Sequence, residues 1–130
     1  MLFQMKHELQ STAKFLCNFL PAKNISKLFY QSLLFVFEQK YKNHWFPEKP
    51  SKSSAHRCIR ISDYAIEPLL LQAGRMCNIT EEMLRTHLPK ELILWIDPGS
   101  VIYRLGEHGQ LCVLYDIKWA TCCCCCRYNK

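Results

Sequence analysis

The sequence predicts an α+β domain in which N-terminal helices pack on a small, mainly antiparallel sheet. Three observations support this class. Apolar residues recur at helical spacing through the first 41 residues, strand-length apolar runs separated by turn residues fill positions 92–115, and 130 residues suit about one domain. We expect this domain to span residues 1–118, and residues 119–130 to form a disordered, cysteine-rich tail.

Two long helices are predicted at the start of the chain. The first covers about 6–20 and ends before Pro21, with an apolar stripe of Leu9, Ala13, Leu16 and Leu20. The second is expected to begin at a cap formed by Asn24 or Ser26 and to run to about Tyr41. Its predicted inner face comprises Ile25, Leu28, Phe29, Ser32, Leu33, Val36 and Phe37. Because this helix is too apolar for a single stripe, Leu34 and Phe35 are expected on its outer face.

A stiff aromatic loop is predicted after the second helix. Pro47 and Pro50 fix φ and bias the residues before them toward extended backbone, and Trp45 and Phe46 add two rigid rings. Such a loop is either a structural brace or a recognition surface. The alternation over 56–61 then predicts a strand with two opposite faces, one carrying Ile59 and Ile61 and the other Cys58 and Arg60.

Short helices and a hairpin complete the predicted domain. Pro68 suits the first turn of a helix that reaches Met76, and Thr80 suits the cap of another that Pro89 ends. The apolar run 92–96 is short enough to be a buried strand. Turn chemistry over 97–100 and 106–109 separates it from strands at 101–105 and 111–115.

Charge is distributed unevenly along the chain. Residues 1–60 hold ten Lys and Arg against three acids, a net of +7, and residues 61–130 hold seven against eight, a net of −1. A basic half raises a nucleic-acid hypothesis, but no RRM-type aromatic pair, glycine loop or zinc-finger spacing accompanies it. Solvated helix faces explain the charge better, through Lys6, Lys14, Lys23, Lys27 and Lys40. No direct nucleic-acid partner is therefore expected.

Apolar runs and cysteines indicate the compartment. No run approaches the roughly 18 residues that span a bilayer, and the start lacks the pattern of a secretory signal. We expect a location in the cytoplasm and nucleus, reduced thiols and no stable membrane insertion. Of nine cysteines, four are predicted to be small buried hydrophobes, namely Cys17, Cys58, Cys77 and Cys112. The run 122–126 is interpreted as a low-complexity tail, with palmitoylation or metal binding as alternatives.

Catalytic signatures are weak. Common phosphate-binding, zinc-protease and hydrolase motifs are missing from the sequence. Cys58 with His56 and His44 resembles a Cys–His nucleophile pair, and Asp97 with Glu107 resembles a carboxylate pair across a turn. A strand cysteine in an apolar run is more often a core residue, and turn capping suits Asp97. A non-enzymatic protein without cofactor or metal is therefore predicted.

A binding-type group remains in Trp95 and Asp97, beside the Trp45–Phe46 pair. Tryptophan dominates interface hot spots because it buries a large rigid area at low entropic cost. Trp95 suits the core, but it also lies at the end of a strand beside a turn, which leaves its edge available to a partner.

Two motifs resemble those of the BTG/Tob anti-proliferative family, in its short BTG type. The first, similar to box A, runs from His44-Trp45-Phe46-Pro47-Glu48-Lys49-Pro50 to Arg57-Cys58-Ile59-Arg60-Ile61. The second, similar to box B, comprises Leu88–Leu92, Leu94–Pro98 and Tyr103–Glu107 and continues to Val113–Tyr115. The resemblance covers about residues 5–116 and implies helices over a small antiparallel sheet.

The resemblance also implies a function. Family members are non-enzymatic adaptors that dock the DEDD-type nuclease subunit of the Ccr–Not deadenylase complex. They promote shortening of mRNA poly(A) tails, act as transcriptional cofactors with transcription factors as partners, and restrain proliferation. The family's docking residues map to Trp95, Asp97 and His56, with Pro98 and Glu107 assigned to the same surface. Of the first motif, we assign a structural role to His44, Trp45, Phe46, Pro47, Pro50, Arg57, Cys58 and Arg60.

Departures from the family pattern leave alternatives open. His56 replaces a usual Tyr, Ser53 and Ala55 stand where the family has Gly, and Gly99 and Ser100 replace a bulky aromatic and a Glu. The tail also lacks the further motif assigned to contact with poly(A)-binding protein. The alternatives are a divergent paralogue that no longer binds the nuclease and a basic RNA-binding module.

Overall fold

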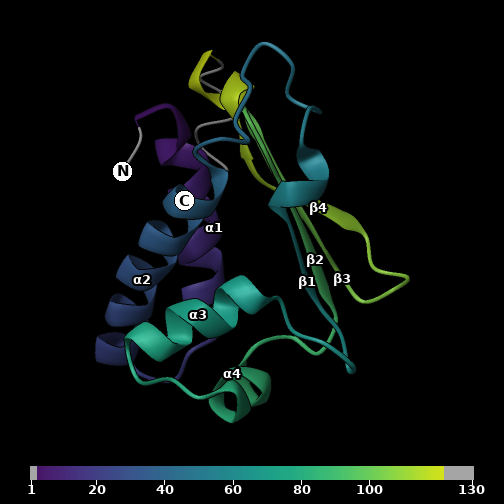
Figure 1. Cartoon of the computed structure of the whole chain (residues 1–130). Coiled ribbons are helices and arrows are strands. Elements are labelled where there is room, and N and C mark those ends of the chain that lie inside the picture. Colours follow the sequence, from purple (N-terminus) through teal and green to yellow (C-terminus); the bar gives the residue numbers. More distant parts are fainter. Residues whose placement is uncertain (1–2, 122–130) are drawn as a thin grey trace.

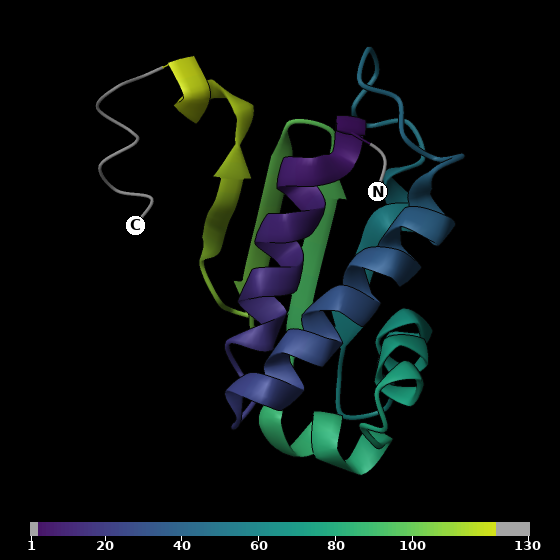
Figure 2. The same cartoon turned by 90° about the vertical axis from the view of Figure 1, so that its left-hand side faces the viewer.

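Helices and sheet occupy separate layers in the computed structural model of the chain, which describes residues 3–121 (Figures 1 and 2). The helices α1, α2 and α3 lie on one side of a four-stranded sheet, whose other side faces away from them. The main elements are α1 (Lys6–Cys17), α2 (Lys23–Tyr41), β1 (Cys58–Ile61), α3 (Pro68–Met76), α4 (Glu81–His87), β2 (Leu92–Asp97), β3 (Ser100–Leu105) and β4 (Leu111–Asp116). The predicted α+β class is confirmed.

The sheet is an antiparallel meander in the order β1-β2-β3-β4. Along β2, Leu92, Leu94 and Ile96 are buried, whereas the alternating residues Ile93, Trp95 and Asp97 are only half-buried. The predicted buried strand is therefore covered on one face only. We call the opposite face, which carries Trp95, the outer face.

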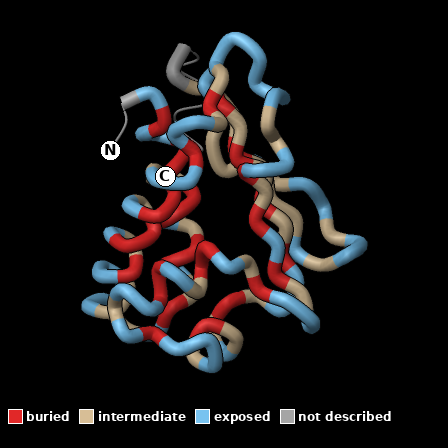
Figure 3. Tube along the Cα trace, viewed as in Figure 1, coloured by how far each residue is buried: buried red, intermediate tan, exposed pale blue. Residues whose placement is uncertain are grey.

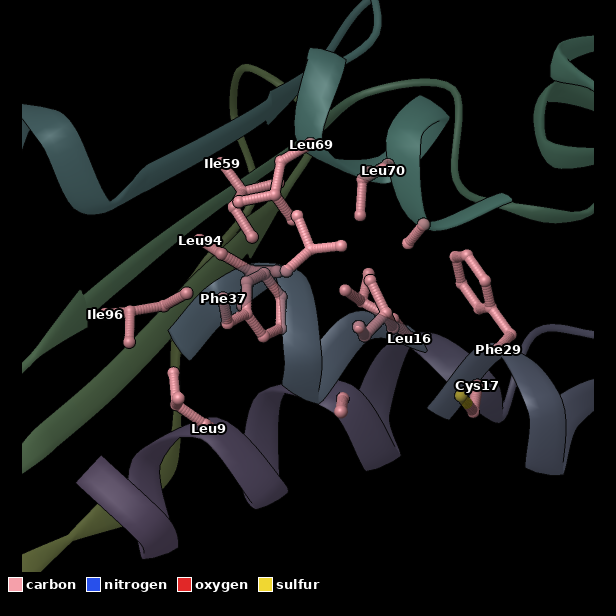
Figure 4. Close-up of a cluster of buried hydrophobic side chains, with 14 of the residues drawn as sticks. Leu9, Leu16, Cys17, Phe29, Phe37, Ile59, Leu69, Leu70, Leu94 and Ile96 are labelled. Atoms are coloured by element: carbon pink, nitrogen blue, oxygen red, sulfur yellow. The ribbon is translucent and has the colours of Figure 1, made fainter. Parts of the chain in front are cut away.

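A single apolar core joins the helices to the inner face of the sheet (Figures 3 and 4). Leu9 and Leu16 of α1 meet Phe37 of α2, and β2 contributes Leu94 and Ile96. The helical side chains come from the predicted apolar stripes of the two long helices, and Leu94 and Ile96 come from the predicted strand run. The five helix lysines expected in solvent are exposed.

Several local predictions need correction. Helix α1 ends at Cys17 rather than near Leu20, although Leu20 is still buried. Neither proposed residue caps α2, which follows Ala22, and the Ser26 hydroxyl instead donates to the Cys17 carbonyl at 3.2 Å. Leu28 is 53% exposed rather than inward. Of the two expected outer residues, Phe35 is exposed while Leu34 packs against the core.

The strand predicted over 56–61 begins two residues later, at Cys58. The preceding residues Ser54–Arg57 form a 3-10 turn, entered from Ser53 at φ +63°. A left-handed residue suits glycine, which is the residue that the family resemblance implies at this position. The expected faces of the strand are confirmed, with Ile59 and Ile61 buried and Arg60 exposed.

The end of the described chain follows β4. A 3-10 turn over Ile117–Thr121 crosses the predicted domain boundary at 118, and the cysteine run lies outside the described residues. Of the four remaining cysteines, Cys17 is buried as predicted, and the other three are half-buried. No helix within residues 3–121 combines the length and the apolar content needed to cross a membrane.

Candidate functional site

Trp95 lies half-buried in the middle of the outer face. Its backbone pairs with Cys58 on β1 and with Ile102 on β3, and Ile102 pairs in turn with Val113 on β4. These four residues form a row across all four strands, and Val113 is 49% exposed. In the described part of the chain, no α-helix covers this face (Figure 1). The row therefore presents an accessible apolar surface centred on an indole ring.

Arg57 is the fully buried residue that fixes the aromatic loop to this edge of the sheet. Its five N–H donors all have acceptors. Nε donates to the Ile96 carbonyl at 2.7 Å, Nη1 to the carbonyls of His44 and Lys52, and Nη2 to the Pro50 carbonyl at 2.7 Å and Asp97 Oδ1 at 2.9 Å. A buried guanidinium is tolerable only when it is paired and its hydrogen bonds are satisfied. We call Arg57 and these acceptors the arginine clamp.

Asp97 is held at one oxygen by this clamp. Oδ1 accepts from Arg57 and also from the Ser54 hydroxyl at 3.1 Å, while the side chain as a whole is 29% exposed. Asp97 and Trp95 are two residues apart on the same strand face, about 7 Å along the strand. The second carboxylate oxygen is thus available to a partner that also contacts the indole.

The aromatic loop is a brace at one residue and an open surface at others. Trp45 is 7% exposed, with the Arg57 guanidinium 5.5 Å from its ring centroid, and its Nε1 has no hydrogen-bond partner among the described residues. Phe46 is half-buried beneath the Lys52 ammonium group at 4.2 Å. Pro47 and Pro50 are exposed. Trp45 therefore braces the loop, and recognition through the exposed loop residues stays a prediction.

His56 is exposed at the edge of the same region. Its ring stacks on that of His44, with centroids 4.3 Å apart and an interplanar angle of 19°. His56 belongs to the 3-10 turn and not to β1, so it does not extend the strand face that carries Cys58 and Arg60. His56 thus belongs to the turn whose Ser54 and Arg57 bond Asp97, and its stack on His44 makes a flat aromatic surface there.

The β2–β3 turn closes this end of the sheet. Pro98 is buried, and Gly99 at φ +86° has the left-handed backbone that glycine adopts most easily. The Gly99 N–H donates to Glu8 Oε2 at 2.9 Å, and the Gly99 carbonyl accepts from Ile117 N–H at 2.8 Å. The turn is thereby tied to α1 and to the segment after β4.

Glu107 does not join the other predicted docking residues. Leu92 pairs with Leu105, so Glu107 follows the end of β3 that lies farthest from Asp97. The two carboxylates are at opposite ends of the sheet, and the carboxylate pair considered from sequence does not form. Arg60 is also apart from the clamp, exposed on the outer face. Sequence reasoning missed the anchoring role of Glu8 and the outer-face positions of Ile102 and Val113, although the alternation in β3 carried a signal for Ile102.

Comparison with known proteins places this arrangement in a family. A model of the BTG family matches residues 5–115. The chain belongs to the BTG family. Human Protein BTG1 is 42% identical over 114 residues, covering 84% of this chain and 66% of BTG1. Human Protein BTG2 is 44% identical over 90 residues, covering 69% of this chain and 56% of BTG2.

A longer relative and a solved structure extend the comparison. Rat Protein Tob1 is 36% identical over 115 residues, which cover 88% of this chain and 31% of Tob1. The C. elegans FOG-3 BTG/Tob domain has the same fold, with a TM-score of 0.72 at 18% identity over 89% of this chain and 87% of that domain. This BTG family chain thus spans just under two thirds of the length of the mammalian BTG1 relatives it matches.

Proposed function

We propose that this BTG family protein is an adaptor that docks the DEDD-type nuclease subunit of the Ccr–Not deadenylase complex. The observation that carries the proposal is a half-buried tryptophan on an uncovered sheet face, beside a carboxylate that a buried arginine holds at one oxygen only. A hot spot of this kind combines a rigid apolar area with an oriented charge. In this role the protein promotes deadenylation, co-regulates transcription with transcription-factor partners and restrains proliferation, in the cytoplasm and nucleus.

The departures from the family pattern bear on affinity rather than on the fold. His56 keeps a planar ring at the edge of the face through its stack on His44, but it offers less area than the usual tyrosine. Gly99 and Ser100 offer less contact area and charge than an aromatic and a glutamate. Trp95 and Asp97 remain in place. We call the surface formed by Trp95, Asp97 and His56 the docking face, and we expect it to bind the nuclease subunit with reduced affinity.

Substitution of Trp95 tests the assignment. The full-length Trp95→Ala variant should bind the purified nuclease subunit at least about tenfold more weakly, because truncation of a hot-spot residue costs about 2 kcal/mol or more. Surface plasmon resonance measures the change, and circular dichroism and thermal unfolding verify the fold. Tyr64, which is 97% exposed in the loop after β1, provides the control variant Tyr64→Ala.

A gain-of-affinity variant guards against misfolding as an explanation. His56→Tyr enlarges the ring at the edge of the docking face and should tighten nuclease binding. Wild-type affinity in Trp95→Ala, or weaker binding in a well-folded His56→Tyr variant, would contradict the proposed site.

A further inference from the structure

We infer that the outer face carries a second binding site, at the end opposite Asp97, for an acidic peptide segment that presents an apolar side chain next to a carboxylate. The site is a cavity of about 330 Å³ beside β1, β2 and β3. That volume lies at the lower end of the range for ligand pockets, which suits one or two side chains rather than a large ligand.

Two arginines flank the cavity on neighbouring positions of the sheet. Arg60 pairs with Ile93 across β1 and β2, and Ile93 pairs with Arg104 across β2 and β3. The arginines are therefore in one row, separated by two strand spacings, or about 10 Å, with Ile93 between them. Both guanidinium groups can converge on a single anion above Ile93.

Neither arginine is occupied by the protein itself. Within residues 3–121, the side chains of Arg60 and Arg104 form no ion pair, and Arg104 Nε is buried without a hydrogen-bond partner. Arg57 differs in this respect, because all five of its N–H donors have acceptors. A buried N–H without an acceptor carries a desolvation cost that a bound carboxylate would remove.

The other residues that line the cavity indicate which ligand groups would bind next to the carboxylate. Ile93 supplies apolar surface on the outer face, while the core residues Ile61 and Leu92 border the cavity from the buried side. Two exposed carboxylates, Glu91 and Glu107, stand at the rim. An apolar side chain suits the cavity, while arginine recognises a carboxylate with two parallel hydrogen bonds. The rim carboxylates disfavour a strongly anionic surface such as nucleic acid or lipid, so a peptide with one or two acids placed next to an apolar side chain fits best.

The test uses the full-length protein and a defined probe. A fluorescein-labelled peptide Gly-Ser-Asp-Leu-Asp-Ser-Gly is titrated with the protein, and fluorescence anisotropy gives the Kd. Wild-type protein should saturate the probe, and Arg60→Gln and Arg104→Gln should each weaken binding by about tenfold or more. Arg75→Gln, at an exposed arginine on α3, is the matched control and should leave the Kd unchanged.

Variants of the probe identify the ligand groups that the site recognises, and NMR mapping locates the site on the sheet. Replacing both Asp by Asn, or Leu by Ala, should weaken binding, and amide shifts in NMR spectra should concentrate around Arg60, Ile93 and Arg104. Trp95→Ala should still bind the probe, and Arg104→Gln should still bind the nuclease. The two proposed sites can therefore be tested, and contradicted, separately. No wild-type binding up to about 1 mM, or equal losses in Arg75→Gln and Arg104→Gln, would overturn the inference.

Discussion

Arg57 shows how a single side chain organises the docking face from within. Its guanidinium connects the aromatic loop to the carboxyl end of β2 and holds Asp97 at Oδ1. The residue thus acts on the proposed interface without being accessible to a partner.

Replacing Arg57 should strongly destabilise the fold. Arg57→Gln removes the charge next to Asp97 and leaves several carbonyls without donors, for which we expect a loss of about 3–5 kcal/mol in the free energy of unfolding. Urea denaturation measures this loss. Arg75→Gln should change stability by less than about 0.5 kcal/mol.

The conservative variant separates charge from geometry. Lysine keeps the charge, but its ammonium group has three donors on a compact centre and cannot reach acceptors on both sides of the clamp. Arg57→Lys should therefore remain clearly less stable than wild type. Wild-type stability in this variant would show that charge alone explains the role of Arg57.

Sequence reasoning reached only part of this residue-scale picture. The adjacency of Trp95 and Asp97 follows from their positions two apart on one strand. The clamp does not follow, because arginine is expected at the surface and its acceptors come from segments up to 40 positions away. Only the assembled loop makes burial of Arg57 favourable.

At the scale of the elements, two turns of the sheet contain glycines with similar backbone angles but different surroundings. Gly99 and Gly106 both have positive φ, +86° and +78°. A Cβ at Gly99 would stand 3.3 Å from Ile117 Cγ2, whereas a Cβ at Gly106 would have no atom within 4 Å.

Alanine substitution at each turn should separate the cost of backbone strain at positive φ from the cost of the steric contact with Ile117. Gly106→Ala should cost about 1 kcal/mol of unfolding free energy through its backbone alone, and Gly99→Ala should cost more because Ile117 must move. Chemical denaturation of both variants checks the order. Equal losses would mean that the contact with Ile117 adds nothing.

Element-scale predictions failed where one pattern permits two structures. The alternation over 56–61 suits a strand, yet the 3-10 turn takes residues 56 and 57 because the clamp pulls Arg57 inward. The apolar run of β2 suited burial on both faces, but residues 3–121 provide no layer of α-helices for the outer face. Capping at Thr80 was predicted correctly, since the motif is local and its side chain accepts from Met83 N–H at 3.1 Å.

At the scale of the whole molecule, burial of phenols and thiols ties stability to pH. Burial raises the pKa of Cys17 to about 11 and raises that of Tyr41 well above its usual range. Both groups thus stay protonated in the folded state at pH values where the unfolded chain ionises, near 8.5 for Cys and 10 for Tyr. Their stabilising contribution is complete below these values and is lost as pH rises.

The free energy of unfolding should therefore fall from about pH 9 upward. Urea titrations between pH 7 and 11 measure the slope. Cys17→Ser should flatten the fall that begins near pH 9, and Tyr41→Phe the part above about pH 10, each relative to its own value at pH 7. An unchanged slope in both variants would contradict the attribution to these groups.

The arginine clamp also imposes an order on synthesis. Three of its backbone acceptors, on His44, Pro50 and Lys52, are translated before Arg57, but those at Ile96 and Asp97 follow 39 and 40 residues later. At about 5–20 residues per second, this delay lasts about 2–8 s. During that interval the Arg57 guanidinium lacks its acceptors on Ile96 and Asp97 and cannot yet be buried with all its donors satisfied. The loop that bears Trp45 therefore reaches its final shape only after the strand that bears Trp95 has been made.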